Sequence, residues 1–318
     1  MKTPAHWNKK NLLSYLLLPI GCIYALITRI RTKIFFGKKV SVPVICVGNL
    51  TAGGTGKTPV AISLAKMLKN NGYNPFFISR GYGGSLKGII VDNEKHTAKE
   101  VGDEPLLLSR QASVSINSDR VKAAQLAIQN GADILIMDDG FQNPWLKKDV
   151  SFIVVDGGFG FGNKYPIPAG PLREFFGPGM RRADAVIIVG KDEKKLERKI
   201  HKPIFKAFVK PELKKIEDEK IVAFAGIGRP EKFYNSLQEL GANVIQTIDF
   251  PDHHFYTEKE LNEIIESATK HKAQIFTTSK DFVKIPYSFQ KHFNVLEIEV
   301  EWEKDSYIEN FILDKIKI

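Results

Sequence analysis

The chain has 318 residues, 43% of them hydrophobic, so it can bury one large core or two modest ones. Its 46 basic and 36 acidic residues give a formal net charge of +10, which suits an anionic partner: a nucleotide phosphate, a nucleic acid or a membrane surface. The two cysteines, Cys22 and Cys46, lie in an apolar run and in a predicted buried strand, so they suggest neither a disulfide framework nor a cysteine metal site, and a reducing compartment is expected.

The first distinctive feature is an uncharged apolar segment at residues 12–27, which basic residues flank on both sides. A transmembrane helix needs about 20 apolar residues, and this segment has 16, with Pro19 and Gly21 in its middle. Cations at both ends favour a helix that lies at the membrane surface, held by anionic headgroups. A signal peptide and a plain buried core helix are the alternatives, although no small-residue cleavage site follows.

The middle of the chain alternates between short apolar runs and segments with helical periodicity. Residues 42–47 are apolar and rich in β-branched side chains, a glycine-rich turn follows, and residues 58–69 have apolar side chains at helical spacing. The pattern then predicts a strand at 75–78, a helix at 120–129, and strands at 133–137, 152–155 and 185–189. This alternation predicts a mostly parallel sheet covered by helices.

Residues 157–179, which connect two of these strands, are rich in glycine, proline and phenylalanine. Loops longer than about 12–15 residues in a compact domain are usually functional or disordered, and the aromatic content argues against disorder. We therefore expect a functional segment. An internally packed surface loop is the alternative.

A charged stretch at 191–202 indicates a boundary, because the strand and helix pattern starts again beyond it. The later pattern predicts strands at 221–225, 243–247, 274–277 and 295–300, with a helix opened by Pro230 and another at 258–270. A second, smaller α/β lobe fits this pattern.

The first predicted strand, turn and helix contain the sequence GGTGKT at residues 53–58, the second half of a phosphate-binding loop (P-loop). In such a loop, backbone N–H groups and a lysine bind phosphate oxygens, and the next hydroxyl binds Mg²⁺. The full pattern has glycine where this chain has Thr51, and the flanking strand and helix compensate for that departure. The expected nucleotide-binding residues are Thr51, Ala52, Gly53, Gly54, Thr55, Gly56, Lys57 and Thr58.

Two consecutive carboxylates, Asp138 and Asp139, follow the apolar run at 134–137. Mg²⁺ that accompanies a nucleotide needs a carboxylate at the end of a strand beside the P-loop, so we expect Thr58, Asp138 and Asp139 to form the metal site. Aspartates after a strand often cap the next turn instead, and that interpretation is the alternative.

Three further polar groups are weak indicators singly. Asp103, which precedes Glu104, has the position of a helix N-cap, and Arg173 with Glu174 has the appearance of an exposed ion pair. The pair at 253–254 is two adjacent histidines, which without other spaced ligands are poor evidence for a metal and fit a solvated turn.

Two classes of nucleotide-binding protein can be compared directly with these residues. Membrane-associated partitioning ATPases have an additional lysine where this chain has Ala52. Guanine-binding proteins have an [NT]KxD segment, whereas the sequence TSKD at 278–281 lacks the intervening residue. ATP is therefore favoured over GTP.

Six motifs occur in order along the chain: VGNLTAGGTGKTP, SRGYGG, GDEP, DDGFQ, PAGPLRE and FPDHHFY. With them the chain resembles the tetraacyldisaccharide 4'-kinase (lipid A 4'-kinase) family, from the apolar amino-terminal segment to about residue 280. The resemblance implies transfer of the ATP γ-phosphate to the 4'-hydroxyl of tetraacyldisaccharide 1-phosphate in lipid A biosynthesis. It also implies a peripheral or monotopic enzyme at the cytoplasmic face of the inner membrane.

The resemblance also implies a role for each site residue. It places Lys57 on the phosphates, Thr58 on Mg²⁺, and Asp138 and Asp139 at the metal and the reacting phosphate. Asp103 becomes the general base, assisted by His253 from the second lobe rather than by its neighbour His254. Arg173 is expected to contact the substrate or the developing charge, with Glu174 and Glu104 as further substrate contacts, and the roles of Arg80 and Tyr82 stay open.

The expected fold class is α/β: a P-loop NTPase fold with a mostly parallel sheet, a second smaller α/β lobe and an N-terminal membrane-associated helix. The expected division is 1–38 for the membrane-surface helix region, 39–205 for the P-loop kinase domain and 206–318 for the smaller lobe. The expected partners are ATP, Mg²⁺, the lipid substrate and the inner-membrane surface, with no nucleic acid and no obligate protein partner. Two alternatives are a soluble P-loop kinase of a small metabolite, which the apolar segment disfavours, and a membrane-associated ATPase switch, which Ala52 disfavours.

Overall fold

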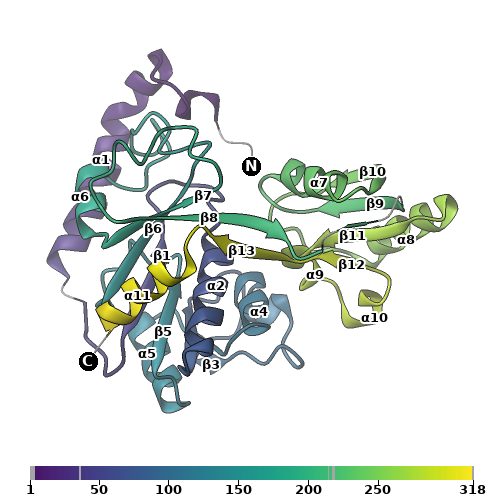
Figure 1. Ribbon diagram of the computed structural model, residues 1–318, viewed down its shortest axis with the longest axis horizontal. Helices are drawn as coiled ribbons and strands as arrows, with labels where there is room; N and C mark the ends of the chain where they lie inside the picture. The colour runs from purple at the N-terminus through teal and green to yellow at the C-terminus, as the bar shows by residue number, and fades with distance from the viewer. Residues whose placement is uncertain (1–3, 36, 214, 217–218, 317–318) are drawn as a thin grey trace.

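The structure, a computed structural model, describes residues 4–35, 37–213, 215–216 and 219–316, which fold into two lobes (Figure 1). The larger lobe contains a nine-stranded sheet in the order β13-β8-β7-β6-β1-β5-β2-β4-β3. Its strands are β1 (Val44–Gly48), β2 (Pro75–Ser79), β3 (Ile89–Ile90), β4 (Val114–Ile116), β5 (Ile134–Asp138), β6 (Val150–Asp156), β7 (Ala185–Val189), β8 (Ile204–Pro211) and β13 (Ile298–Trp302). Neighbours are parallel except β3 with β4 and β13 with β8, so the expected mostly parallel sheet is present.

Helices cover both faces of this sheet because its central strands are apolar on both sides. One core contains side chains of α2 and α11, and the other contains side chains of α5 and of the segment at 157–179. The helices of this lobe are η1 (Ala5–Trp7), α1 (Leu12–Ile34), α2 (Lys57–Asn70), α3 (Ala98–Val101), α4 (Asp103–Ser109), α5 (Arg120–Gln129), α6 (Phe176–Arg182) and α11 (Asp305–Ile316).

The smaller lobe contains a four-stranded parallel sheet in the order β10-β9-β11-β12. Its core has one side built on α7 and the other on α8. The elements are β9 (Lys220–Ala225), α7 (Pro230–Glu239), β10 (Asn243–Asp249), α8 (Glu258–His271), β11 (Gln274–Thr278), α9 (Ser279–Phe282), α10 (Tyr287–Gln290) and β12 (Asn294–Leu296).

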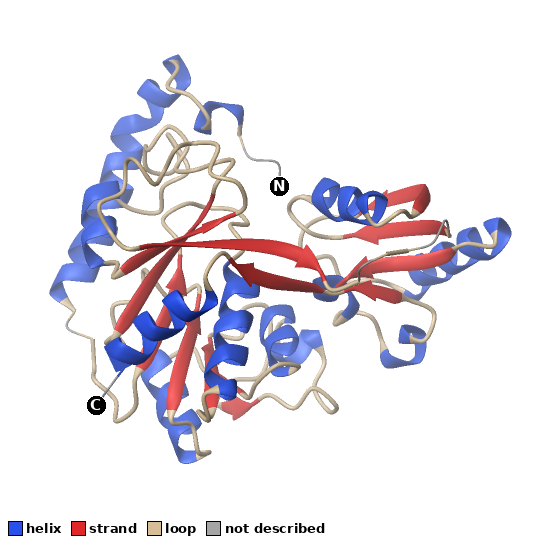
Figure 2. Cartoon of the chain, in the orientation of Figure 1, coloured by secondary structure: helices blue, strands red, loops and turns tan. Residues whose placement is uncertain are grey.

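Two strands of the large sheet, β8 and β13, extend as an antiparallel pair toward the smaller lobe (Figure 2). The boundary expected after residue 205 falls inside β8, and the chain returns to the large sheet through β13 and α11. The single strand predicted at 295–300 is wrong: it is two strands in two sheets. Leu296 is buried in the smaller core and Trp302 in the larger one, which separates them. The expected division into domains stays a prediction.

The amino-terminal helix α1 is longer than the predicted segment at 12–27, because it continues to Ile34. Small residues face the protein: a Cβ on Gly21 would lie 2.7 Å from the Pro166 carbonyl oxygen. Large apolar side chains face outward, and Leu16 is 67% exposed. By length and composition, α1 could cross a membrane, and no other helix among the described residues could. Only 22% of its most apolar stretch is buried, so the alternative of a buried core helix is wrong.

The glycine-rich segment at 157–179 is ordered by contacts with the amino terminus. Asn163 donates its side-chain amide to the His6 carbonyl oxygen at 2.9 Å, and the Trp7 indole donates to the Pro168 carbonyl oxygen at 3.1 Å. The segment also bonds within itself, since Asn163 donates to the Ala169 carbonyl oxygen at 2.9 Å. It is therefore internally packed, as the alternative interpretation held, and it also carries Arg173 to Asp139 beside the P-loop.

Candidate active site

The P-loop joins the end of β1 to the start of α2. Gly56 has a φ of 86°, a left-handed conformation that a side chain disfavours, and it caps the helix that Lys57 begins. Thr51 is almost fully buried and pairs with Leu172, while the Ala52 N–H donates to the Pro171 carbonyl oxygen at 2.8 Å. Thr51 thus stands where the usual P-loop pattern has glycine, and its pairing with Leu172 does not need a positive φ.

The Asp138 carboxylate lies beside the start of α2. The Thr58 hydroxyl donates to Asp138 Oδ2 at 2.7 Å, and Asp138 Oδ1 is buried without a partner among the described residues. Burial, with the nearby Glu104 carboxylate, raises the pKa of Asp138 to about 7. An unpartnered carboxylate oxygen next to a hydroxyl and a phosphate loop fits Mg²⁺, which usually takes one or two protein oxygens and the phosphates.

Asp139 has a different environment from its neighbour. Its Oδ1 lies 2.7 Å from Arg173 Nη1 and 3.7 Å from Lys57 Nζ, and a φ of 53° turns the residue toward them. Burial opposes its ionisation, but Lys57 and Arg173 hold the pKa of Asp139 below its usual value. The adjacent carboxylates are therefore distinct, since Asp138 faces the Thr58 hydroxyl and Asp139 faces the cations.

Arg173 and Glu174 do not form the exposed ion pair considered from the sequence. The Glu174 carboxylate is buried, and its Oε1 accepts from Arg182 at 2.8 Å and from Gln142 at 3.0 Å. This geometry is contrary to the expected substrate contact of Glu174, because its oxygen is already bonded inside the protein. Arg173 is partly exposed and stays in the site.

Asp103 is the first residue of α4, and Gly102 rather than Asp103 occupies the N-cap position. Gly102 has a φ of 93°, and a Cβ there would lie 2.5 Å from the Tyr82 carbonyl oxygen. The glycine-rich motif at 79–84 therefore packs against the backbone that presents Asp103. The neighbouring Glu104 acts electrostatically on Asp138, so α4 begins beside the carboxylates of the P-loop site.

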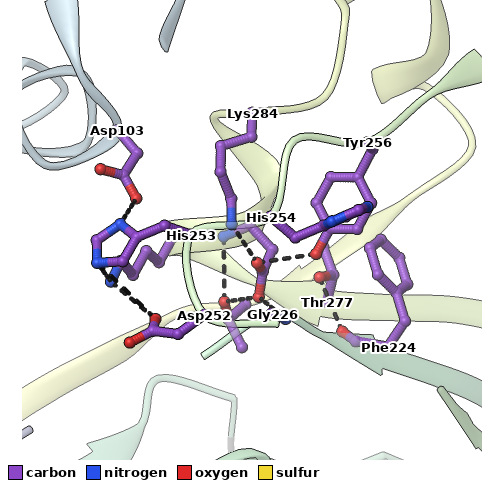
Figure 3. A network of polar contacts seen from close by, with 12 residues as sticks. Asp103, Phe224, Gly226, Asp252, His253, His254, Tyr256, Thr277 and Lys284 are labelled. Carbon is purple, nitrogen blue, oxygen red and sulfur yellow. Dashed lines mark hydrogen bonds and ion pairs between the residues drawn. The ribbon is translucent and has the colours of Figure 1, made fainter. Parts of the chain in front are cut away.

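His253, from the smaller lobe, contacts Asp103 of the larger lobe. Its Nδ1 lies 2.7 Å from Asp103 Oδ2, and Figure 3 shows the two side chains pointing toward each other. His254 instead contacts Glu260 at 3.0 Å and stacks on Phe250, so the structure brings His253, not His254, to Asp103. His253 lies in a turn and its side chain is 42% exposed, as the solvated-turn interpretation expected, but each imidazole also has a carboxylate partner.

The pKa values of His253 and Asp103 are shifted in opposite directions. The hydrogen bond that its imidazole donates to Asp103 raises the pKa of His253 above its usual value. Burial opposes ionisation of Asp103, yet the hydrogen bond to His253 and the charge of Lys280 keep the pKa of Asp103 below its usual value. The imidazole is thus the better proton acceptor of the two.

Three charged residues that the sequence patterns did not single out also lie in or near the site. Lys280 Nζ is 3.3 Å from His253 Nε2. Asp156, at the end of β6, pairs with Lys232 of the other lobe at 3.0 Å. Arg120 is buried with Nε and Nη1 unpartnered among the described residues, and burial lowers its pKa to about 10. Nothing local in the sequence TSKD at 278–281 points to the contact of Lys280 with His253.

Comparison with known proteins adds to this geometry. The sequence model of the family described as tetraacyldisaccharide-1-P 4'-kinase matches residues 13–317. The chain belongs to this kinase family. A tetraacyldisaccharide 4'-kinase of Rhodospirillum rubrum is 42% identical over 330 residues, covering 99% of each chain, and one of Gluconobacter oxydans is 42% identical over 310 residues, covering 95% of this chain and 94% of that one.

A solved structure supports the same assignment. LpxK from Aquifex aeolicus, described as an "apo" form in complex with ATP, matches with a TM-score of 0.79 and 29% identity. The match covers 96% of this chain and 100% of that one. The expected tetraacyldisaccharide 4'-kinase family and the expected fold class, with its P-loop sheet, smaller α/β lobe and apolar amino-terminal helix, are confirmed.

Proposed function

We propose that this chain transfers the γ-phosphate of ATP to the 4'-hydroxyl of tetraacyldisaccharide 1-phosphate. The relatives and the ATP complex of LpxK support the reaction and the nucleotide. One observation of this structure carries the proposal: His253 of the smaller lobe contacts Asp103, at the start of the helix whose Glu104 carboxylate acts on Asp138 of the P-loop site. An acid–base pair at this place can remove the proton of an acceptor hydroxyl.

The phosphate side of the reaction rests on positioning and charge. The P-loop N–H groups and Lys57 hold the phosphates, and Arg173 lies where charge develops on the transferred group. Thr58 and Asp138 would hold Mg²⁺, which when bound neutralises phosphate charge. Asp139 keeps Lys57 and Arg173 oriented toward this point.

The acceptor side rests on the pair that joins the lobes. A bond forms between the 4'-oxygen and the γ-phosphorus while the bond from that phosphorus to the β,γ-bridging oxygen breaks, and ADP leaves. The hydroxyl proton passes to His253 Nε2, with Asp103 orienting the ring through Nδ1. The pKa directions thus favour the imidazole as the base, in place of the Asp103 carboxylate expected from the resemblance.

The helix α1 gives the enzyme access to its lipid. Leu16, Ile23 and Ile27 are each at least 60% exposed, along a helix whose other face is packed on the protein. Because Gly21 contacts the long loop directly, the helix cannot cross the bilayer without taking the loop with it. A helix lying in the interface of the inner membrane, at its cytoplasmic face where ATP is available, satisfies both faces.

The test is a transfer assay with the purified chain in detergent micelles, ATP, Mg²⁺ and tetraacyldisaccharide 1-phosphate. Lipid phosphorylation is expected with the unmodified chain and is expected to fall in Lys57→Ala, Asp103→Ala and His253→Ala. His254→Ala is the matched control beside His253 and is expected to lose less. ATP hydrolysis without lipid phosphorylation would favour an ATPase switch, and phosphorylation of soluble sugars alone would favour a metabolite kinase; either result would refute the proposal.

A further inference from the structure

Lys280, the second residue of α9, contacts the catalytic histidine from the side opposite Asp103. Its Nζ lies 3.3 Å from His253 Nε2 and 3.4 Å from Asp252 Oδ1. The Lys280 side chain is 24% exposed, so it is mostly shielded from solvent. Figure 3 shows His253 between Asp103 on one side and Asp252 on the other.

The two neighbours of the imidazole permit only one tautomer. A carboxylate accepts hydrogen bonds, so His253 Nδ1 must donate its N–H to Asp103. An ammonium group only donates, so His253 Nε2 must accept from Lys280. We propose that Lys280 is a positioning residue that holds His253 as the neutral Nδ1–H tautomer, so that the Nε2 lone pair accepts from Lys280 until the acceptor hydroxyl takes its place. This inference rests on the proposed role of His253 as the base.

The charges around the ring oppose one another. Asp103 and Asp252 favour the imidazolium, whereas Lys280 disfavours it, and Lys284 acts on Asp103 from further away. The balance raises the pKa of His253, and removal of Lys280 would raise it further. Without Lys280 the base would therefore be protonated, and inactive, over a wider range of pH. When the hydroxyl reaches Nε2, Asp252 retains the displaced ammonium.

The position of Lys280 is set by its neighbour in sequence. Asp281 is fully buried and accepts from Lys284 Nζ at 2.7 Å and from the Tyr256 hydroxyl at 2.9 Å. It also accepts from the Gly226 N–H at 3.0 Å. Tyr256 follows the histidine loop closely, so one carboxylate ties α9 to that loop, and the network is visible in Figure 3. Lys280 and His253 are thus held by the same cluster.

Two variants separate charge from side-chain bulk. Lys280→Met removes the ammonium and keeps the length of the side chain, whereas Lys280→Arg keeps a group that only donates. The acid limb of kcat/KM for the lipid reports the free enzyme, in which Lys280 contacts the ring. We expect Lys280→Met to move that limb up by about one pH unit, so that the rate below the limb falls about tenfold. The limb of kcat is expected to move less, and Lys280→Arg is expected to restore both.

A second readout does not depend on catalysis. The ¹⁵N chemical shifts of the imidazoles, assigned among the seven histidines with His253→Gln, report the tautomer directly. We expect the Nδ1–H form in the unmodified chain and in Lys280→Arg, and imidazolium at neutral pH in Lys280→Met. An Nε2–H signal in the unmodified chain, or a uniform loss of rate with an unmoved limb and tautomer, would overturn the inference. Full activity of His253→Gln would instead sink the proposed base, while the tautomer still tests Lys280.

Discussion

Asp281 is the central acceptor of the buried cluster in the smaller lobe, and Asp281→Asn keeps its volume while removing its charge. The Lys284 ammonium, whose side chain has no exposed surface, would then stay buried without a counter-charge. Breaking a buried pair from one side costs about 3–5 kcal/mol, whereas exposed pairs contribute about 0–1 kcal/mol. We therefore expect the free energy of unfolding to fall by about 3–5 kcal/mol in Asp281→Asn.

The assay is urea-induced unfolding followed by circular dichroism, with hydrogen–deuterium exchange to locate the loss in the smaller lobe. Lys259→Met is the control, because its pair with Glu263 is largely exposed, at 3.9 Å, and should contribute less than about 1 kcal/mol. Asp281→Asn combined with Lys284→Met removes both charges, so the two effects should couple by at least about 2 kcal/mol. A loss below about 1 kcal/mol, or a coupling near zero, would refute the reasoning.

Four further outcomes are expected. Lys57→Ala should lower kcat for lipid phosphorylation by about 10²–10³-fold, because its charge is lost from the phosphates; an unchanged rate contradicts this. Asp138→Asn should raise the Mg²⁺ concentration for half-maximal rate at least about tenfold, and an unaltered titration would locate the metal elsewhere. A base must be deprotonated, so kcat is expected to fall as the pH falls through the raised pKa of His253. Asp103→Asn removes the hydrogen bond that raises this pKa and should move the acid limb of the pH profile to lower pH. An unmoved acid limb would show that Asp103 does not raise the pKa of His253. Gly21→Val should cost about 1–3 kcal/mol of stability, since its Cβ would lie 2.7 Å from a carbonyl oxygen of the long loop, and equal urea midpoints for the two chains would count against that packing.

The sequence alone predicted the helices and strands whose ends are marked by neighbouring capping or turn residues. The helix at 120–129 and the strand at 185–189 match their observed bounds, because Asp119 caps the first and both strand ends are marked by turn residues. The P-loop was found from the spacing of glycine, lysine and threonine, which the chemistry of phosphate binding constrains within a few residues. Such signals need no knowledge of the rest of the fold.

Long-range features could not be predicted in the same way. The alternating residues at 295–300 indicate strand structure but not which sheet each half joins, and that depends on two separate cores. Nothing local distinguishes a buried Glu174 from an exposed one, since its partner Arg182 lies on the following helix. The contact of His253 with Asp103 spans 150 residues and was expected from the resemblance alone.

The contacts between the lobes explain why the acid–base pair sits where it does. Among the described residues, three ion pairs join the lobes near the site: His253 with Asp103, and both Lys232 and Arg229 with Asp156. The basic side chains of these pairs are 38–68% exposed. Exposed pairs contribute little, although α4 of the larger lobe also packs against α9 of the smaller one. Lobes of one chain move relative to one another by default unless their interface is large and hydrophobic. The proposed base would therefore meet the P-loop only when the lobes are together. Separation of the lobes would remove that base from bound ATP, which would suppress transfer until the lipid hydroxyl is enclosed, and it would open a path for ADP to leave.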